Sequence, residues 1–102
     1  MRLDDKTIKI IKEFGLFYFG SNAKIYIFGS RVDDLKKGGD IDIYAETDLA
    51  VSSLELFNIE SNYWVSLQKA LGERKIDIIV NDINFNKSNY IYDVAKKTGV
   101  AI

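Results

Sequence analysis

Three aspartates are the residues of this sequence whose type and spacing most favour chemistry. Asp40 and Asp42 are separated by one isoleucine, and Asp77 lies within a later apolar run from Lys75 to Val80. Residues two apart in a strand project from the same face, so Asp40 and Asp42 are expected on one face and the flanking isoleucines on the other. If the two runs form neighbouring strands, Asp77 completes a cluster of three carboxylates.

Such a cluster predicts a divalent metal site. Carboxylates held close together repel each other unless a cation lies between them, and hard oxygen ligands suit Mg²⁺ or Mn²⁺. Two metal ions held by three carboxylates, beside bound phosphates, form the arrangement used for in-line attack on a nucleotide phosphate. The competing interpretation is an α/β domain whose acids are ordinary residues of strand ends.

A Gly-Ser pair follows the apolar run Lys24 to Phe28, which is predicted to be a strand. Gly29 allows close approach to the backbone, Ser30 adds a hydroxyl, and free N–H groups past a strand end bind phosphate. Arg31 comes next, and Lys36 and Lys37 lie in the same polar segment before Asp40. Two interpretations of these three cations remain open, namely a solvated loop and neutralisation of a bound phosphate.

The order of these motifs resembles the signature of the DNA polymerase β-type nucleotidyltransferase superfamily. The matching parts are Gly29-Ser30, the run to Gly39, Asp40-x-Asp42 and the strand aspartate Asp77. The short chain is most similar to the minimal branch of that superfamily, the MntA or antitoxin-like group. The resemblance implies an α/β (α+β) nucleotidyltransferase fold, with a small mixed β-sheet flanked by helices.

The same resemblance implies roles for the site residues. It assigns Gly29 and Ser30 to the triphosphate, with Arg31 as a further nucleotide-binding candidate, and Asp40 and Asp42 to two Mg²⁺ ions. Asp77 would ligate one metal ion and help to deprotonate the acceptor hydroxyl.

The implied reaction is transfer of a nucleoside monophosphate, with ATP expected as the donor of AMP. Minimal relatives are typically paired with a helical HEPN-domain toxin, so the resemblance implies an antitoxin that modifies such a partner. A second interpretation stays open, in which the chain neutralises its partner by contact alone. The three carboxylates favour the enzyme, since a pure binder has no need of a repulsive cluster.

Composition excludes several other chemistries. The 102 residues are expected to form one domain, and they contain neither cysteine nor histidine. Thiolate nucleophiles, disulfides and histidine bases are therefore excluded. A net charge of −1 argues against broad, salt-driven binding to nucleic acid. Every apolar run is interrupted by polar or charged residues and no signal pattern is found, so no membrane partner and a cytoplasmic location are expected.

Two longer helices are predicted to position these strands. The first is expected from Leu3 to Phe19, starting at Asp4 or Asp5 and stopping at Gly20. A capping box, Ser52-x-x-Glu55, opens the second, which runs to about Leu71. Helical spacing predicts two inward stripes, one formed by Leu3, Thr7, Ile10, Ile11, Phe14, Phe17 and Tyr18, and the other by Leu56, Ile59, Tyr63, Leu67 and Ala70.

The remaining aromatic residues suggest contact surfaces. Phe57 and Trp64 lie off the second stripe and are candidates for a partner or subunit surface, although Trp64 could equally cover the edge of the sheet. The segment Asn81 to Lys87 is expected to be a polar turn. A last helix is predicted from Ser88 to Lys97, in which Tyr90 and Tyr92 cannot both face inward, and the apolar end from Gly99 is expected to dock as a short edge strand.

Overall fold

One mixed β-sheet forms the centre of the fold. The computed structural model describes residues 3–28, 41–85 and 90–102. The strands run in the order β3-β2-β1-β4, in which β1 pairs antiparallel with β2 and β4 while β2 pairs parallel with β3. They are β1 (Lys24–Phe28), β2 (Ile41–Thr47), β3 (Ile76–Asp82) and β4 (Val100–Ala101).

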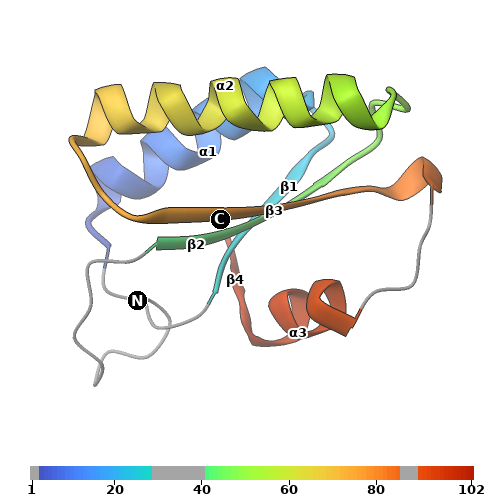
Figure 1. Cartoon of the computed structure of the whole chain (residues 1–102). Coiled ribbons are helices and arrows are strands. Elements are labelled where there is room, and N and C mark those ends of the chain that lie inside the picture. The colour runs from blue at the N-terminus through green and yellow to red at the C-terminus, as the bar shows by residue number, and fades with distance from the viewer. Residues whose placement is uncertain (1–2, 29–40, 86–89) are drawn as a thin grey trace.

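Helices cover both faces of this sheet, as predicted for an α+β fold. The two long helices lie together on one face, and the short third helix lies on the other (Figure 1). The second helix is the crossover that a parallel pair requires, because it joins β2 to β3. The helices are α1 (Asp5–Phe19), α2 (Ser53–Leu71) and α3 (Tyr90–Thr98), and a 3₁₀ turn, Ile83–Phe85, follows β3.

The ends of the long helices carry the predicted signals. Asp4 caps α1 by accepting a hydrogen bond from the Thr7 N–H at 2.7 Å, and this bond lowers the pKa of the Asp4 carboxyl. Ser52 caps α2 by accepting from the N–H of Glu55 at 3.2 Å. Gly20 and Gly72 follow the last residues with φ of 100° and 81°, a region that favours glycine. Both helices therefore begin and end at locally encoded positions.

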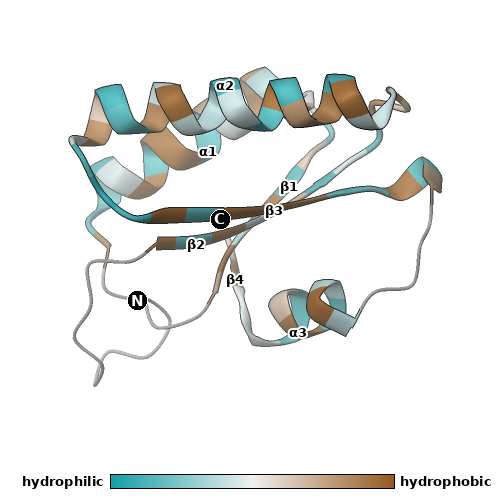
Figure 2. Ribbon diagram, viewed as in Figure 1, coloured by the Kyte–Doolittle hydropathy of each residue, from teal (hydrophilic) through white to brown (hydrophobic). Residues whose placement is uncertain are grey.

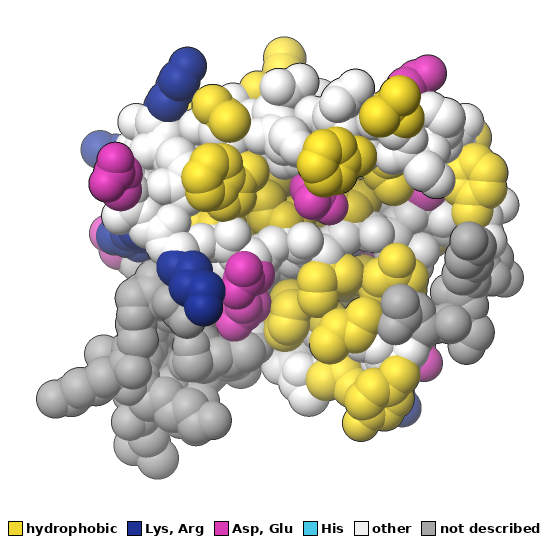
Figure 3. Space-filling view, in the orientation of Figure 1, with side chains coloured by type: hydrophobic (Ala, Val, Ile, Leu, Met, Phe, Trp, Pro, Cys, Tyr) yellow, Lys and Arg dark blue, Asp and Glu magenta, His cyan; other side chains and the backbone are white. Residues whose placement is uncertain are grey.

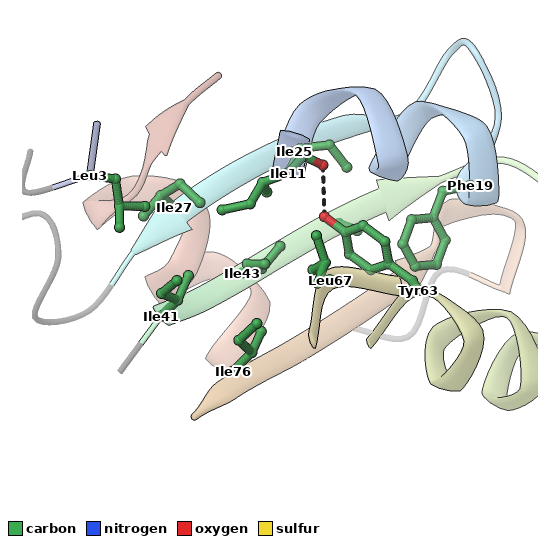
Figure 4. Close-up of a cluster of buried hydrophobic side chains, with 11 residues drawn as sticks. Leu3, Ile11, Phe19, Ile25, Ile27, Ile41, Ile43, Tyr63, Leu67 and Ile76 are labelled. Carbon is green, nitrogen blue, oxygen red and sulfur yellow. Dashed lines mark hydrogen bonds between the residues drawn. The ribbon is translucent and has the colours of Figure 1, made fainter. Parts of the chain in front are cut away.

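The hydrophobic core lies between the sheet and the two long helices. Figure 2 shows β3 apolar over most of its length beneath α2, and Figure 4 shows core side chains from both layers pointing toward one another. The Tyr63 hydroxyl donates to the carbonyl of Ile11 at 2.9 Å, which links α2 to α1 inside the core. The buried apolar cluster comprises Leu3, Ile11, Phe19, Ile25, Ile27, Ile41, Ile43, Ala45, Tyr63, Leu67 and Ile76.

Gly15 lets α1 pack closely on the sheet. A Cβ at this position would lie 2.8 Å from Cδ1 of Ile25 and 3.4 Å from the Tyr63 hydroxyl. The missing side chain therefore makes room for a strand residue and for the tyrosine that joins the two helices.

The predicted inward stripes are wrong at one position each. Phe17 is 79% exposed, because α1 turns Gly15 and Phe19 inward and a residue two positions from each lies on the opposite side. Ala70 is exposed in the last turn of α2, where the stripe continues from Leu67 to the partly buried Leu71. The Phe57 and Trp64 side chains are exposed, as their position off the second stripe predicts.

The third strand is longer than predicted. It extends to Asp82, which pairs with Thr47 at the end of β2, so the expected polar turn begins two residues later than Asn81. Ile79 projects on the same side as Asp77, whereas Ile76 and Ile78 project on the other side. At the chain's end, Val100–Ala101 pairs with β1 as a short edge strand, as expected.

Candidate functional site

The register of β2 and β3 places two of the three predicted carboxylates opposite each other. Asp42 and Asp77 are paired positions of these parallel strands, whose spacing is about 4.8 Å. Their inward-facing neighbours Ile41, Ile43 and Ile76 lie in the core beneath α1 and α2. Both carboxylates therefore project from the opposite face of the sheet, where Asp42 is half-buried and Asp77 is exposed.

The remaining predicted site residues fall outside the described residues. Asp40 and the nucleotide-binding candidates Gly29, Ser30 and Arg31 belong to residues 29–40. The described residues on either side of that range lie at one end of the sheet, since Phe28 pairs with Asp42 and Ile41 with Ile76.

The donor set of the described pair fits a hard divalent cation. Asp42 and Asp77 offer carboxylate oxygens on one face, the ligand type that Mg²⁺ prefers. Within residues 3–28, 41–85 and 90–102 there is no group of three histidines, cysteines or acids placed to hold a metal ion. The predicted third ligand, Asp40, lies outside those ranges.

A hydrogen-bonded network continues along the face that carries the carboxylates. The Tyr44 hydroxyl donates to Oε2 of Glu46 at 3.1 Å and accepts from Nδ2 of Asn81 at 3.2 Å. Lys96 of α3 forms a 3.2 Å ion pair with the same Glu46 oxygen, which raises the pKa of the lysine. The network joins β2, β3 and α3 two residues beyond Asp42.

Contacts between aromatic rings support this network. The Tyr44 ring makes tilted contacts with the rings of Tyr26 and Tyr92, whose centroids lie 5.6 and 5.8 Å away. Burial raises the pKa of the Tyr44 phenol to about 12. Tyr92 is half-buried and Tyr90 is 83% exposed, so only one of these two tyrosines of α3 faces the sheet, as predicted. Glu46, at the sixth position of β2, holds α3 against the sheet through its ion pair with Lys96.

Asp77 also borders a hollow of about 340 Å³ at the outer edge of β3. The hollow continues to α2, where burial raises the pKa of the Glu60 carboxyl. Trp64 lies beside it and donates from Nε1 to the carbonyl of Ile76 at 3.1 Å, so this indole covers the sheet edge at Ile76, where β3 begins. The hollow is lined by Glu60, Ser61, Trp64, Val65, Ile76, Asp77 and Ile78.

The sequence interpretation missed Asn81 and Glu60 as residues near the site. Asn81 lies four positions after Asp77, so the same period of two that relates Asp40 to Asp42 could have placed it on the carboxylate face. Glu60 had no such signal, because its position beside β3 depends on how α2 crosses the sheet.

Comparison with known proteins identifies a family. A family model described as "Nucleotidyltransferase domain" matches residues 5–101, which is nearly the whole chain. No curated protein matches this chain. Among the described residues, no helix has both the length and the apolar character that a membrane crossing demands.

Proposed function

The chain belongs to the nucleotidyltransferase domain family, and on this premise we propose that it transfers a nucleoside monophosphate from a nucleoside triphosphate to an acceptor hydroxyl. The observation that carries the proposal is the pairing of Asp42 with Asp77 on one face of adjacent parallel strands. The acceptor oxygen forms a bond to the α-phosphorus, the bond to the bridging oxygen breaks, and pyrophosphate leaves.

Each site residue has a role in this proposal. Asp42 and Asp77, with Asp40, hold two Mg²⁺ ions, which supply positive charge where the attacking and leaving oxygens become negative. Asp77 receives the proton of the acceptor hydroxyl, and its exposure is compatible with contact to an incoming substrate. Gly29, Ser30 and Arg31 bind the triphosphate, with ATP as the expected donor.

We further propose a protein as the acceptor. The resemblance to minimal nucleotidyltransferases supports a HEPN-domain toxin as the partner, AMP as the transferred group and an antitoxin role. The exposed Phe57 and Trp64 of α2 offer apolar contact area for such a partner. The alternative is an antitoxin that neutralises the same partner by binding alone.

A labelling experiment tests the catalytic proposal. The chain, with its partner if one co-purifies, is incubated with α-³²P-labelled ATP and Mg²⁺, and label on protein is followed by gel. We expect the unchanged chain to transfer label, and we expect EDTA to abolish this transfer. The Asp77→Asn variant should transfer label at least a hundredfold more slowly. The matched control is Asp48→Asn, which neutralises an exposed acid outside the site.

Binding of MgATP, measured by calorimetry, separates the two antitoxin mechanisms. MgATP binding with label transfer supports the enzyme. Partner binding with neither MgATP binding nor label transfer supports neutralisation by contact and overturns the catalytic proposal. Unaltered transfer by a folded Asp77→Asn protein refutes the role assigned to that carboxylate.

A further inference from the structure

The outer edge of β3 carries backbone groups that point away from β2. In the sheet formed by the described residues, β3 is an end strand that pairs with β2 alone. Ile41 of β2 donates from its N–H to the carbonyl of Lys75 at 2.9 Å, so Lys75 and every second residue after it face β2. The backbone groups of Ile76, Ile78 and Val80 therefore face outward.

Two side-chain contacts confirm this direction. Trp64 Nε1 donates to the outward carbonyl of Ile76, and the Tyr92 hydroxyl donates to that of Val80 at 3.4 Å. Ile78 lies between these two positions, with its N–H and carbonyl directed away from β2. An edge of this kind is a template for pairing with another extended chain.

Two hollows lie along this edge, and residues of α2 line part of each. One hollow, of about 340 Å³, lies at the Asp77 end, and a second, of about 240 Å³, lies at the Asp82 end. Figure 3 shows apolar side chains above and below a paler band that crosses the view between α2 and α3. The second hollow is lined by Ser53, Leu56, Val80, Asn81, Asp82, Phe85 and Tyr92.

The described charged side chains that line these two hollows are all acidic. Among the described residues that line the two hollows, Glu60, Asp77 and Asp82 are acidic and none is a lysine or an arginine. A polyanion would be repelled here, and a second copy of this chain would bring the same acids to the edge. A partner with a basic side chain is complementary.

Asp82 marks the position of that basic group. The residue is 5% exposed, and its Oδ1 accepts from the N–H and Nδ2 of Asn84 at 3.1 and 3.0 Å. Its buried Oδ2 has no hydrogen-bond partner within the described part of the chain. A buried carboxylate oxygen without a donor is costly, and a guanidinium or ammonium would satisfy it. The Phe85 and Tyr92 rings in the same hollow also suit a cation.

We propose that the edge of β3 binds an extended polypeptide segment as an added strand, with an arginine or lysine side chain in the hollow at Asp82. The outward backbone of Ile78 pairs with the backbone of the segment, while the acidic lining selects its basic residue. This surface goes beyond nucleotidyl transfer, because binding requires neither nucleotide nor metal ion.

A synthetic peptide tests the proposal. The probe has eight residues, alternating threonine and valine with one central arginine, and carries fluorescein for anisotropy measured in EDTA without nucleotide. Saturable binding of the probe is expected. Replacing the probe's arginine by glutamate, with the protein unchanged, is expected to weaken binding at least tenfold. The Asp82→Asn variant keeps an acceptor for Asn84 and should show the same loss, whereas Asp48→Asn should bind normally.

Amide hydrogen exchange locates the bound peptide. The Ile78 and Val80 N–H groups should exchange at least fivefold more slowly with peptide, while Ile79, which faces β2, should be unchanged. Absence of binding, equal binding of the glutamate peptide, or slowing elsewhere without this alternation overturns the proposal. Self-association through this edge without peptide, seen by size-exclusion chromatography and the same exchange pattern, also overturns it and makes a second copy the occupant. Failure of label transfer leaves these readouts unaffected, so the two proposals fail separately.

Discussion

Alkaline pH is expected to destabilise the protein through Tyr44. The residue is 1% exposed, and burial raises the pKa of its phenol from 10.0 to about 12. The folded state therefore holds the phenolic proton more tightly than the unfolded state. The resulting stabilisation is complete below pH 10 and is lost as pH rises through 12.

The size of the effect follows from the two pKa values. A difference of about two units corresponds to about 2.7 kcal/mol when the loss is complete, and about half of that is lost by pH 11. The hydroxyl lies among the half-buried side chains of Glu46 and Asn81, where solvent screens part of the interaction. We therefore expect Tyr44 to contribute a loss of about 1 kcal/mol between pH 8 and pH 11.

Urea unfolding of the unchanged protein and of Tyr44→Phe, followed by circular dichroism at pH 8 and pH 11, measures this contribution. Phenylalanine keeps the ring contacts with Tyr26 and Tyr92 and removes only the hydroxyl. Burial also raises the pKa of Tyr63, but that residue is present in both proteins, so its contribution cancels when their losses of stability are compared. The unchanged protein should lose about 1 kcal/mol more than the variant. Equal losses would falsify the assignment to the Tyr44 phenol.

Three further predictions concern packing and ligand binding. Gly99→Ala should lower the free energy of unfolding by about 2 kcal/mol in urea titrations, because the added Cβ would meet the carbonyl oxygen of Ala95. An unchanged midpoint of the urea transition would contradict this contact. Tyr63→Phe should lower the free energy of unfolding by about 1 kcal/mol in the same measurement, because the variant lacks the hydrogen bond to the carbonyl of Ile11. A variant as stable as the unchanged protein would argue against that bond. Mg²⁺ with ATP at about a hundredfold excess over Kd should stabilise the fold of the unchanged protein by about 2.7 kcal/mol, measured by thermal melts. The same addition should stabilise the Asp77→Asn variant much less, because that variant lacks one of the proposed metal ligands.

Local signals made much of the fold predictable. The capping residues Asp4 and Ser52 and the stop at Gly20 act on their own helices, so they can be identified without knowing what the helix packs against. The position of Phe17 could not be found in this way. Its spacing fits a broad apolar stripe, and only the close approach at Gly15 decides which part of that stripe faces the sheet.

The candidate site was predictable in part for a similar reason. The alternation around Asp42 and Asp77 indicates a strand in each case, and the structure places the two strands side by side in register. The network of Tyr44, Glu46 and Lys96 was not predicted, because it depends on α3 returning to the sheet from fifty residues farther along the chain. The roles assigned to Gly29, Ser30, Arg31 and Asp40 remain predictions.

The register of β3 also protects the site against errors of pairing. A slip of one residue against β2 would turn Asp77 and Asn81 toward α2 and remove Ile76 and Ile78 from that side. An alignment that separates Asp77 from Asp42 in this way would therefore place a carboxylate in the apolar interior and be disfavoured by several kcal/mol. Mutations of the inward isoleucines can consequently damage the site without touching either aspartate, by weakening the preference for one alignment.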